Sequence, residues 1–165
     1  MKKPINLDRI KRLLTYDPET GVFTRLVSVK GRNAGDIAGC LSDRGYVNIV
    51  VDGVRLKGHR LAWAFVHGVY PEFEIDHKDR NRSNNAIDNL RPATRSQQIV
   101  NRDTSARNTS GAKGVYMLPS GRWRARICKG RKYIHLGYFD SMAEAESVYK
   151  KAASELFGEF ADVTL

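Results

Sequence analysis

The chain has 165 residues, 41% of them hydrophobic, which is enough for one or two ordinary folded cores. Its formal charge of +10, from 28 Lys and Arg against 18 Asp and Glu, suits a polyanionic partner, with nucleic acid as the first expectation. Cys40 and Cys128 are the only cysteines and lie far apart, which argues against a disulfide framework and a cysteine zinc site. No run approaches the ~20 apolar residues of a membrane span, and the first residues lack a signal-peptide core. We therefore expect an intracellular protein in a reducing compartment, without a membrane partner.

Residues 1–70 are expected to form a helix followed by strands and a second helix. The expected elements are a helix over residues 7–14 capped by Asn6, strands over 21–27, 45–51 and 54–57, and a helix over 59–68. Asp52 and Gly53 predict a tight turn between the last two strands. The second helix should end at Gly68 and bury Leu61, Ala62, Phe65 and Val66.

The centre of the chain alternates short apolar segments with a polar loop. The expected elements are a strand over residues 73–77, an asparagine-rich loop, a second strand over 90–93, and a helix over 94–103 capped by Thr94. Residues 105–111 are small and polar and show no periodicity, as a linker does. We place the domain boundary there.

The last segment, residues 112–165, predicts a three-stranded antiparallel sheet with one helix packed on its back. In the central strand Trp123, Ala125 and Ile127 share one face, and Arg122, Arg124 and Arg126 share the other. In the next strand Ile134 and Leu136 should join the core, while Tyr133 and His135 should join the arginines. A capping box at Ser141 begins the helix.

Charge divides this small domain into two sides. Residues 107–133 hold eight Lys or Arg and no acid, whereas residues 134–165 hold six acids and two lysines. Basic side chains beside aromatic rings on one strand face are typical of a DNA or RNA surface, although any exposed strand face is polar. We favour nucleic-acid binding, because the cations lack counter-charges nearby.

Asp76 and His77 are the residues best suited to catalysis. Phosphodiester hydrolysis needs a water, a base that takes its proton and a positive charge at the phosphate. A carboxylate can ligate a metal, and an imidazole can take the proton. Asn89 follows His77 by twelve residues, and the intervening asparagines favour a compact loop.

This pattern resembles the HNH endonuclease motif of phage and intron-associated, homing-type nucleases. The resemblance covers residues 59–102 and implies a strand-strand-helix unit around one divalent metal, Mg²⁺ with Mn²⁺ as the alternative. It implies that Asp76 is a metal ligand, His77 the general base and Asn89 the amide that fixes the loop and orients His77. The family's last ligand is usually Asn or His, whereas this chain has Gln98 there, with Asn101 as a substitute.

Other histidines receive weaker assignments. His59 also matches a position of the HNH pattern, at the start of a helix, and we favour a structural or phosphate-contacting role for it. A zinc site built from Cys40, His59, His67 and His77 has no standard ligand spacing to support it.

Residues 112–165 resemble the plant Apetala-type, or ethylene-response-factor, DNA-binding domain. The resemblance rests on Lys113-Gly-Val-Tyr, Trp123-x-Ala-x-Ile, Leu136-Gly-x-Phe and Gly158, and it implies that the sheet enters the major groove of double-stranded DNA. By position it implicates the following residues in DNA binding: Lys113, Tyr116, Arg122, Arg124, Arg126, Tyr133 and His135.

The sequence therefore predicts an α+β protein with an HNH nuclease domain and β-rich extension over residues 1–104, a linker over 105–111, and a DNA-binding domain over 112–165. By resemblance, water attacks phosphorus and a 5′ phosphate is left. We expect a monomer or weak dimer, in the cytoplasm of a bacterial host if the protein is phage-encoded. Because one site cuts one strand, a monomer would nick DNA. The alternatives are a DNA-binding regulator with a decayed nuclease site, which Gln98 keeps open, and an RNA-binding protein.

Overall fold

In the computed structural model, which describes residues 6–102, 104 and 108–161, helices and short strands alternate in an α+β fold. Contacts between residues divide the chain into a first unit that ends at Pro92 and a second that begins at Ala93. Each unit has its own buried core. None of the helices within the described residues is long and apolar enough to cross a membrane.

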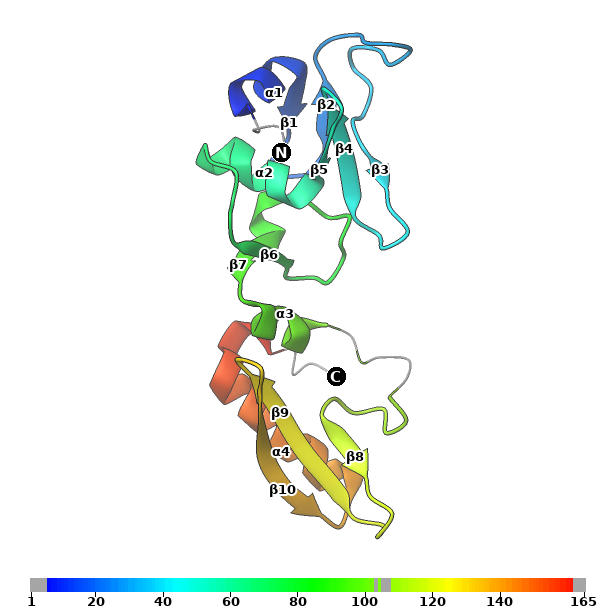
Figure 1. The fold of residues 1–165 in the computed structure, drawn as a ribbon, viewed down its shortest axis with the longest axis vertical. Coiled ribbons are helices and arrows are strands. Elements are labelled where there is room, and N and C mark those ends of the chain that lie inside the picture. The colour runs from blue at the N-terminus through cyan, green and yellow to red at the C-terminus, as the bar shows by residue number, and fades with distance from the viewer. Residues whose placement is uncertain (1–5, 103, 105–107, 162–165) are drawn as a thin grey trace. The chain divides into compact units, whose positions relative to one another are not determined.

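The first unit begins as the sequence predicts. Its elements, visible in Figure 1, are α1 (Leu7–Leu13), β1 (Leu14–Tyr16), β2 (Phe23–Arg25), β3 (Cys40–Leu41), β4 (Val47–Val51), β5 (Val54–Lys57), α2 (Gly58–His67) and β6 (Glu74–His77). Asn6 caps α1 by accepting from the Arg9 amide at 2.9 Å. β3, β4 and β5 form one antiparallel sheet, with the predicted turn at Asp52 and Gly53.

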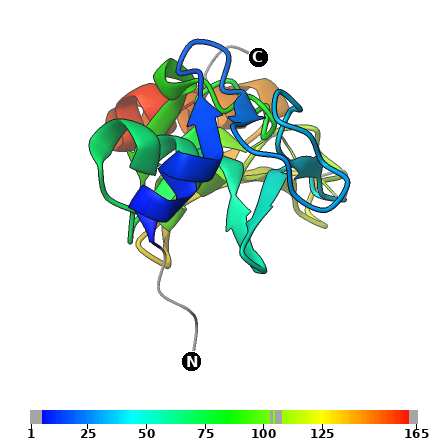
Figure 2. The same cartoon turned by 90° about the horizontal axis from the view of Figure 1, so that it is seen from above.

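The core of the first unit lies between these sheets and the two helices. α1 and α2 lie side by side, as the view from above shows (Figure 2). Phe23, Leu14, Ile49 and Leu61 are fully buried there. Val66 was expected in the core but is 48% exposed, because it lies beyond the side of α2 that meets the sheet.

Two strands follow α2 and form a small sheet of their own. β6 pairs with β7 (Leu90–Ala93), and a polar loop and the short 3-10 helix η1 (Ile87–Asn89) connect them. Of the residues of β6, Ile75, Asp76 and His77 are all buried. A strand end that buries a carboxylate and an imidazole together is the feature that positions the site described below.

The second unit begins with the helix α3 (Arg95–Asn101), whose N-terminus carries a capping box between Thr94 and Gln97. Val100 packs in a core with Ile127 and Phe157, and Ser96 accepts a hydrogen bond from the Gly130 amide at 3.0 Å. The units therefore divide before α3 rather than in the expected linker, residues 105–111. Of that segment, residues 105–107 lie outside the described part of the chain.

The rest of the second unit matches the expected three-stranded sheet and helix. Its elements are β8 (Val115–Met117), β9 (Trp123–Lys129), β10 (Lys132–Phe139), α4 (Met142–Phe157) and the 3-10 helix η2 (Gly158–Phe160). The strand order is β10-β9-β8, and both pairs are antiparallel. α4 covers one face of the sheet, where Val115, Ala125 and Ala145 are fully buried.

One strand of this sheet departs from the expected alternation. Ile134 was expected in the core but is 40% exposed, because β10 is an edge strand. The register shifts between His135 and Gly137, which is a β-bulge. Past the bulge, Tyr138 pairs with Arg124 on the basic face and Phe139 turns into the core.

Candidate active site

His77 ends β6 and is 5% exposed. Its Nε2 lies 3.4 Å from Oδ1 of Asn85, a residue that is itself 1% exposed. The Asn85 amide donates through Nδ2 to the Ser83 carbonyl at 3.3 Å, which turns its oxygen toward the imidazole. An amide oxygen accepts only, so Nε2 carries the hydrogen and, in the neutral ring, Nδ1 is the proton acceptor.

The electrostatic surroundings of His77 favour this neutral form. Burial lowers the pKa of His77, against the opposing effects of its bond to Asn85 and of the negative charges of Asp79 and Asp76. An imidazole that is neutral near pH 7 can take a proton from water. The geometry therefore gives His77 the protonation state that a general base needs.

Asn85 is held in place by the N-terminal strands. The Tyr16 hydroxyl donates to the Asn85 carbonyl at 2.8 Å, and burial raises the pKa of Tyr16 to about 12. Gly21 lies so close to the same backbone that a Cβ there would come within 2.3 Å of the Asn85 carbonyl carbon. The β-rich extension thus fixes the residue that contacts His77.

Asn89 fixes the loop between β6 and β7. Its Nδ2 donates to Oδ1 of Asp79 at 2.9 Å and to the Asn84 carbonyl at 2.9 Å, while its Oδ1 accepts from the Asp79 amide at 3.0 Å. These three bonds close both ends of the loop onto one side chain. The contact to His77 itself comes from Asn85, so Asn89 acts on the imidazole through the loop it holds.

Asp76 is 9% exposed and forms a buried ion pair with Arg91. The guanidinium donates from Nη2 at 3.0 Å and from Nε at 3.1 Å, both to Oδ2 of Asp76. A buried carboxylate needs such a partner to stay ionised. Arg91 therefore holds the Asp76 carboxylate in one orientation.

Comparisons with known proteins identify the family of this chain. The family model described as HNH endonuclease matches residues 57–100. Protein 3.8 of Escherichia phage T7 is 32% identical over 107 residues, which cover 64% of this chain and 88% of the phage protein. The chain belongs to the HNH endonuclease family.

Two further relatives match different stretches of this HNH endonuclease. An uncharacterized HNH endonuclease of Acanthamoeba polyphaga mimivirus is 32% identical over 109 residues, which span 65% of this chain but 56% of the mimivirus protein. APETALA2-like protein 2 of Oryza sativa subsp. indica is 44% identical over 55 residues, which span 32% of this chain and 13% of the rice protein. The chain thus matches little more than half of the mimivirus protein and a small part of the rice protein.

The nuclease's other candidate metal ligands lie on α3 in the second unit. Gln98 is half-buried and Asn101 is 5% exposed. HNH nucleases generally use a divalent metal. Among the described residues, no three His, Cys, Asp or Glu side chains form a metal-binding group.

His59 lies next to His77. Its ring centroid is 5.1 Å from that of His77 and 5.4 Å from that of Tyr46, and the side chain is buried. Burial lowers the pKa of His59 to about 3, and the charges of His77, Arg60 and Lys57 act in the same direction. Within the described structure its Nδ1 has no hydrogen-bond partner. His67 does not join this group and instead packs on Trp63.

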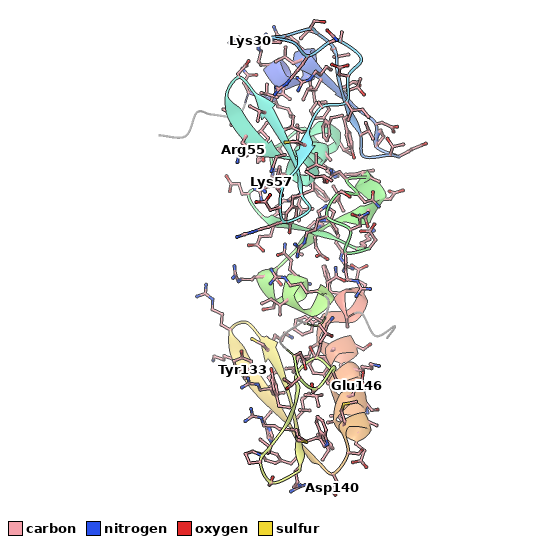
Figure 3. All side chains as sticks on the ribbon, turned by 90° about the vertical axis from the view of Figure 1, so that its right-hand side faces the viewer. Lys30, Arg55, Lys57, Tyr133, Asp140 and Glu146 are labelled. Atoms are coloured by element: carbon pink, nitrogen blue, oxygen red, sulfur yellow. The ribbon has the colours of Figure 1, made fainter. Side chains whose placement is uncertain are left out.

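The sheet of the second unit carries stacked cations and rings. The guanidinium of Arg126 lies 4.8 Å from the Tyr116 ring centroid and 4.3 Å from that of Tyr133. Arg124 lies 5.7 Å from the same Tyr116 ring. In Figure 3 the labelled Tyr133 projects from the sheet side and Glu146 from the helix side. The stacked arginines and tyrosines therefore lie on the sheet side of the unit, away from α4.

The other residues predicted for the DNA-binding surface have contacts outside the Tyr116 and Tyr133 stack. Arg122 pairs with Asp140 at 3.3 Å and lies 5.9 Å from the Tyr138 ring, and His135 stacks on Tyr138 at 4.6 Å. Lys113 instead donates to the Val100 carbonyl at 3.0 Å.

Sequence reasoning missed three residues of these sites. Asn85 was treated only as a turn former, although it supplies the contact to His77. Arg91 is a charged residue in a short apolar strand, which was an available signal for a buried ion pair. Tyr138 reaches the basic face only because of the bulge at Gly137, and strict alternation conceals it.

Proposed function

We propose that this protein is a metal-dependent DNA endonuclease that hydrolyses one strand of double-stranded DNA per encounter. The observation that carries the proposal is the buried His77, whose pKa is lowered by burial and whose ring is oriented by Asn85, next to the Asp76 carboxylate that pairs with Arg91. One such site per chain makes nicking the expected reaction of a monomer, and two chains or two encounters are needed for a double-strand break.

In the proposed reaction His77 accepts the proton of the attacking water at Nδ1, while the Asn85 oxygen holds the hydrogen on Nε2. Asp76 would hold Mg²⁺, or Mn²⁺, and the resemblance implies the amide oxygen of Gln98 as a further ligand. When bound, the metal supplies positive charge at the phosphate and at the leaving 3′ oxygen. Asn89 keeps the loop that carries Asn85 closed during the reaction. The product would carry a 5′ phosphate.

We further propose that the sheet of the second unit binds the DNA duplex. Arg124, Arg126, Tyr116 and Tyr133 form one face of stacked guanidinium groups and rings. The Nε atoms of Arg124 and Arg126 are covered and have no hydrogen-bond partner among the described residues, so stacking holds the guanidinium planes. Such planes can contact phosphates or the guanine edge in the major groove.

Supercoiled DNA incubated with Mg²⁺ tests the nuclease. The wild-type protein should convert it to the open circular form, and His77→Ala should not. Equal nicking by both proteins would end the assignment. Gln98→Asn tests the metal ligand in the same assay, because it restores the usual amide on a side chain one methylene shorter. Faster nicking at limiting Mg²⁺ would support Gln98 as the ligand, and an unchanged Mg²⁺ dependence would oppose it.

A further inference from the structure

Two cations lie over one aromatic ring beside His77, in a place that the HNH assignment does not explain. Lys57 Nζ is 5.0 Å from the Tyr46 ring centroid, and the Arg82 guanidinium is 5.2 Å from it. The Tyr46 centroid in turn is 6.0 Å from that of His77. Tyr46 directly precedes β4, Lys57 ends β5, and Arg82 lies in the loop after β6.

We propose that Tyr46, Lys57 and Arg82 form a phosphate-binding site, which holds a backbone phosphate of the cleaved DNA strand against His77. The inference rests on the proposed function and specifies how the same site holds its substrate. Both cations are exposed, and Tyr46 is half-buried. Solvent and a DNA strand can therefore reach them while the ring keeps them near the buried imidazole.

Lys57 and Arg82 form no ion pair with the acidic side chains that the structure describes. The acid of the neighbouring loop, Asp79, accepts hydrogen bonds from Asn89 and Asn84 instead. Two cations without a counter-charge, held 5 Å or so from one ring, are a site for an anion.

The Arg82 side chain is also fixed in direction. Its Nη1 donates to the Arg44 carbonyl at 3.0 Å, so the planar group is held at both that carbonyl and the Tyr46 ring. Remaining N–H groups of the guanidinium can then donate to phosphate oxygens in a set geometry. Lys57 adds a point charge from the other strand. A phosphodiester fits both partners, because it offers two anionic oxygens.

The field of these cations extends to the imidazoles. Burial is the main cause of the lowered pKa of His77 and of His59, and the charge of Arg82 adds to the first effect and that of Lys57 to the second. Positive charge beside the imidazoles attracts an anionic substrate strand.

DNA binding without metal tests the site apart from cleavage. We would measure the affinity of the full chain for a short duplex in EDTA over a range of salt concentrations. Lys57→Ala and Arg82→Ala should each lower the slope of log affinity against log salt by about 0.9, and the double variant by nearly twice that. Arg55→Ala is the matched control, since Arg55 is exposed on the same strand, two residues from Lys57, as Figure 3 shows.

Tyr46 separates a ring effect from a hydroxyl effect. Tyr46→Phe should bind as the wild type does, whereas Tyr46→Leu should weaken binding several-fold. If Lys57→Ala and Arg82→Ala change the slope no more than Arg55→Ala, the phosphate site is refuted. A lowered slope combined with full nicking by His77→Ala would retain the phosphate site and refute the nuclease assignment instead. Thermal melting of each variant shows that the fold is kept.

Discussion

Arg91 donates two hydrogen bonds to the same carboxylate oxygen of Asp76, at 3.0 and 3.1 Å, between the paired strands β6 and β7. The side chains are 8% and 11% exposed. The carboxylate of the proposed metal ligand is therefore oriented by the Arg91 guanidinium. A metal that binds Asp76 shares this carboxylate with Arg91, which lowers metal affinity but removes the cost of ordering the side chain.

Removal of Arg91 should destabilise the first unit strongly. Arg91→Met leaves a buried carboxylate without its partner, and we expect the free energy of unfolding to fall by about 3–5 kcal/mol. The double variant Asp76→Asn with Arg91→Met should recover a large part of this loss. Urea unfolding is the measurement, followed by Trp63 fluorescence in a Trp123→Phe background, because those are the two tryptophans of the chain.

The control for that measurement is Arg9→Met. Arg9 pairs with Asp52 at 3.3 Å, but its side chain is 52% exposed and that of Asp52 55%. Exposed pairs contribute about 0–1 kcal/mol, so this variant should unfold close to the wild type. Similar losses in Arg91→Met and Arg9→Met would contradict a special role for the buried pair.

Asn85 should control the nicking rate through His77. Asn85→Leu keeps a similar volume but removes the oxygen that accepts from Nε2, and we expect the single-turnover nicking rate to fall by ~10- to 100-fold. Asn85→Asp keeps an acceptor and should retain more activity. DNA affinity in EDTA should stay the same in both. A rate in Asn85→Leu equal to that of the wild type would show that the imidazole is oriented by other contacts.

Gly21 should be intolerant of a side chain. Gly21→Ala places a Cβ about where the Asn85 and Ala86 backbone lies, at 2.3 Å, so both stability and nicking should fall. Gly53→Ala is the matched control, because Gly53 has a similar left-handed φ of 80° against 73° and no atom within 4 Å of the added Cβ. Gly53→Ala should show only the cost of the left-handed conformation, about 1–2 kcal/mol. Equal effects would mean that the close packing of Gly21 is unimportant.

The stability of the first unit should fall in acid because of His59. Its pKa is about 3 in the fold and 6.5 for the ordinary side chain, so the unfolded state binds the proton first. This contribution is complete above about pH 6.5 and is lost as the pH falls toward about 3, with a slope of up to about 1.4 kcal/mol per pH unit. Urea unfolding at several pH values measures it. His59→Gln should flatten the dependence, and an unchanged slope would assign it to other groups.

The basic face of the second unit should account for a defined share of the salt dependence. The double variant Arg124→Ala with Arg126→Ala should lower the affinity for duplex DNA. The slope of log affinity against log salt should become shallower by the amount expected for about two lost phosphate contacts. Lys150→Ala with Lys151→Ala changes the same charge on α4, which covers the other side of the sheet. That control should leave the slope nearly unchanged. The opposite result would place the DNA surface on the helix side.

Local patterns were sufficient for much of the fold. The cap at Asn6, the turn at Asp52 and Gly53, the capping box at Thr94 and the alternation in β9 depend on neighbouring residues, and all are present in the structure. The bulge in β10 depends on Gly137 and its positive φ, which periodicity does not reveal. The partner of α3 was not predictable either, because its apolar residue Val100 fits any core of similar shape.

The sequence by itself determined the HNH endonuclease pattern, because a carboxylate, an imidazole and an amide at fixed spacing can be read without the fold. Tertiary structure decided which side chains contact the residues of this pattern. Asn85 reaches His77, Arg91 reaches Asp76, and Lys57 and Arg82 meet over Tyr46. The physical reason is that desolvation, ion pairing and cation stacking depend on distance in space between segments far apart in the chain, which spacing along the sequence does not specify.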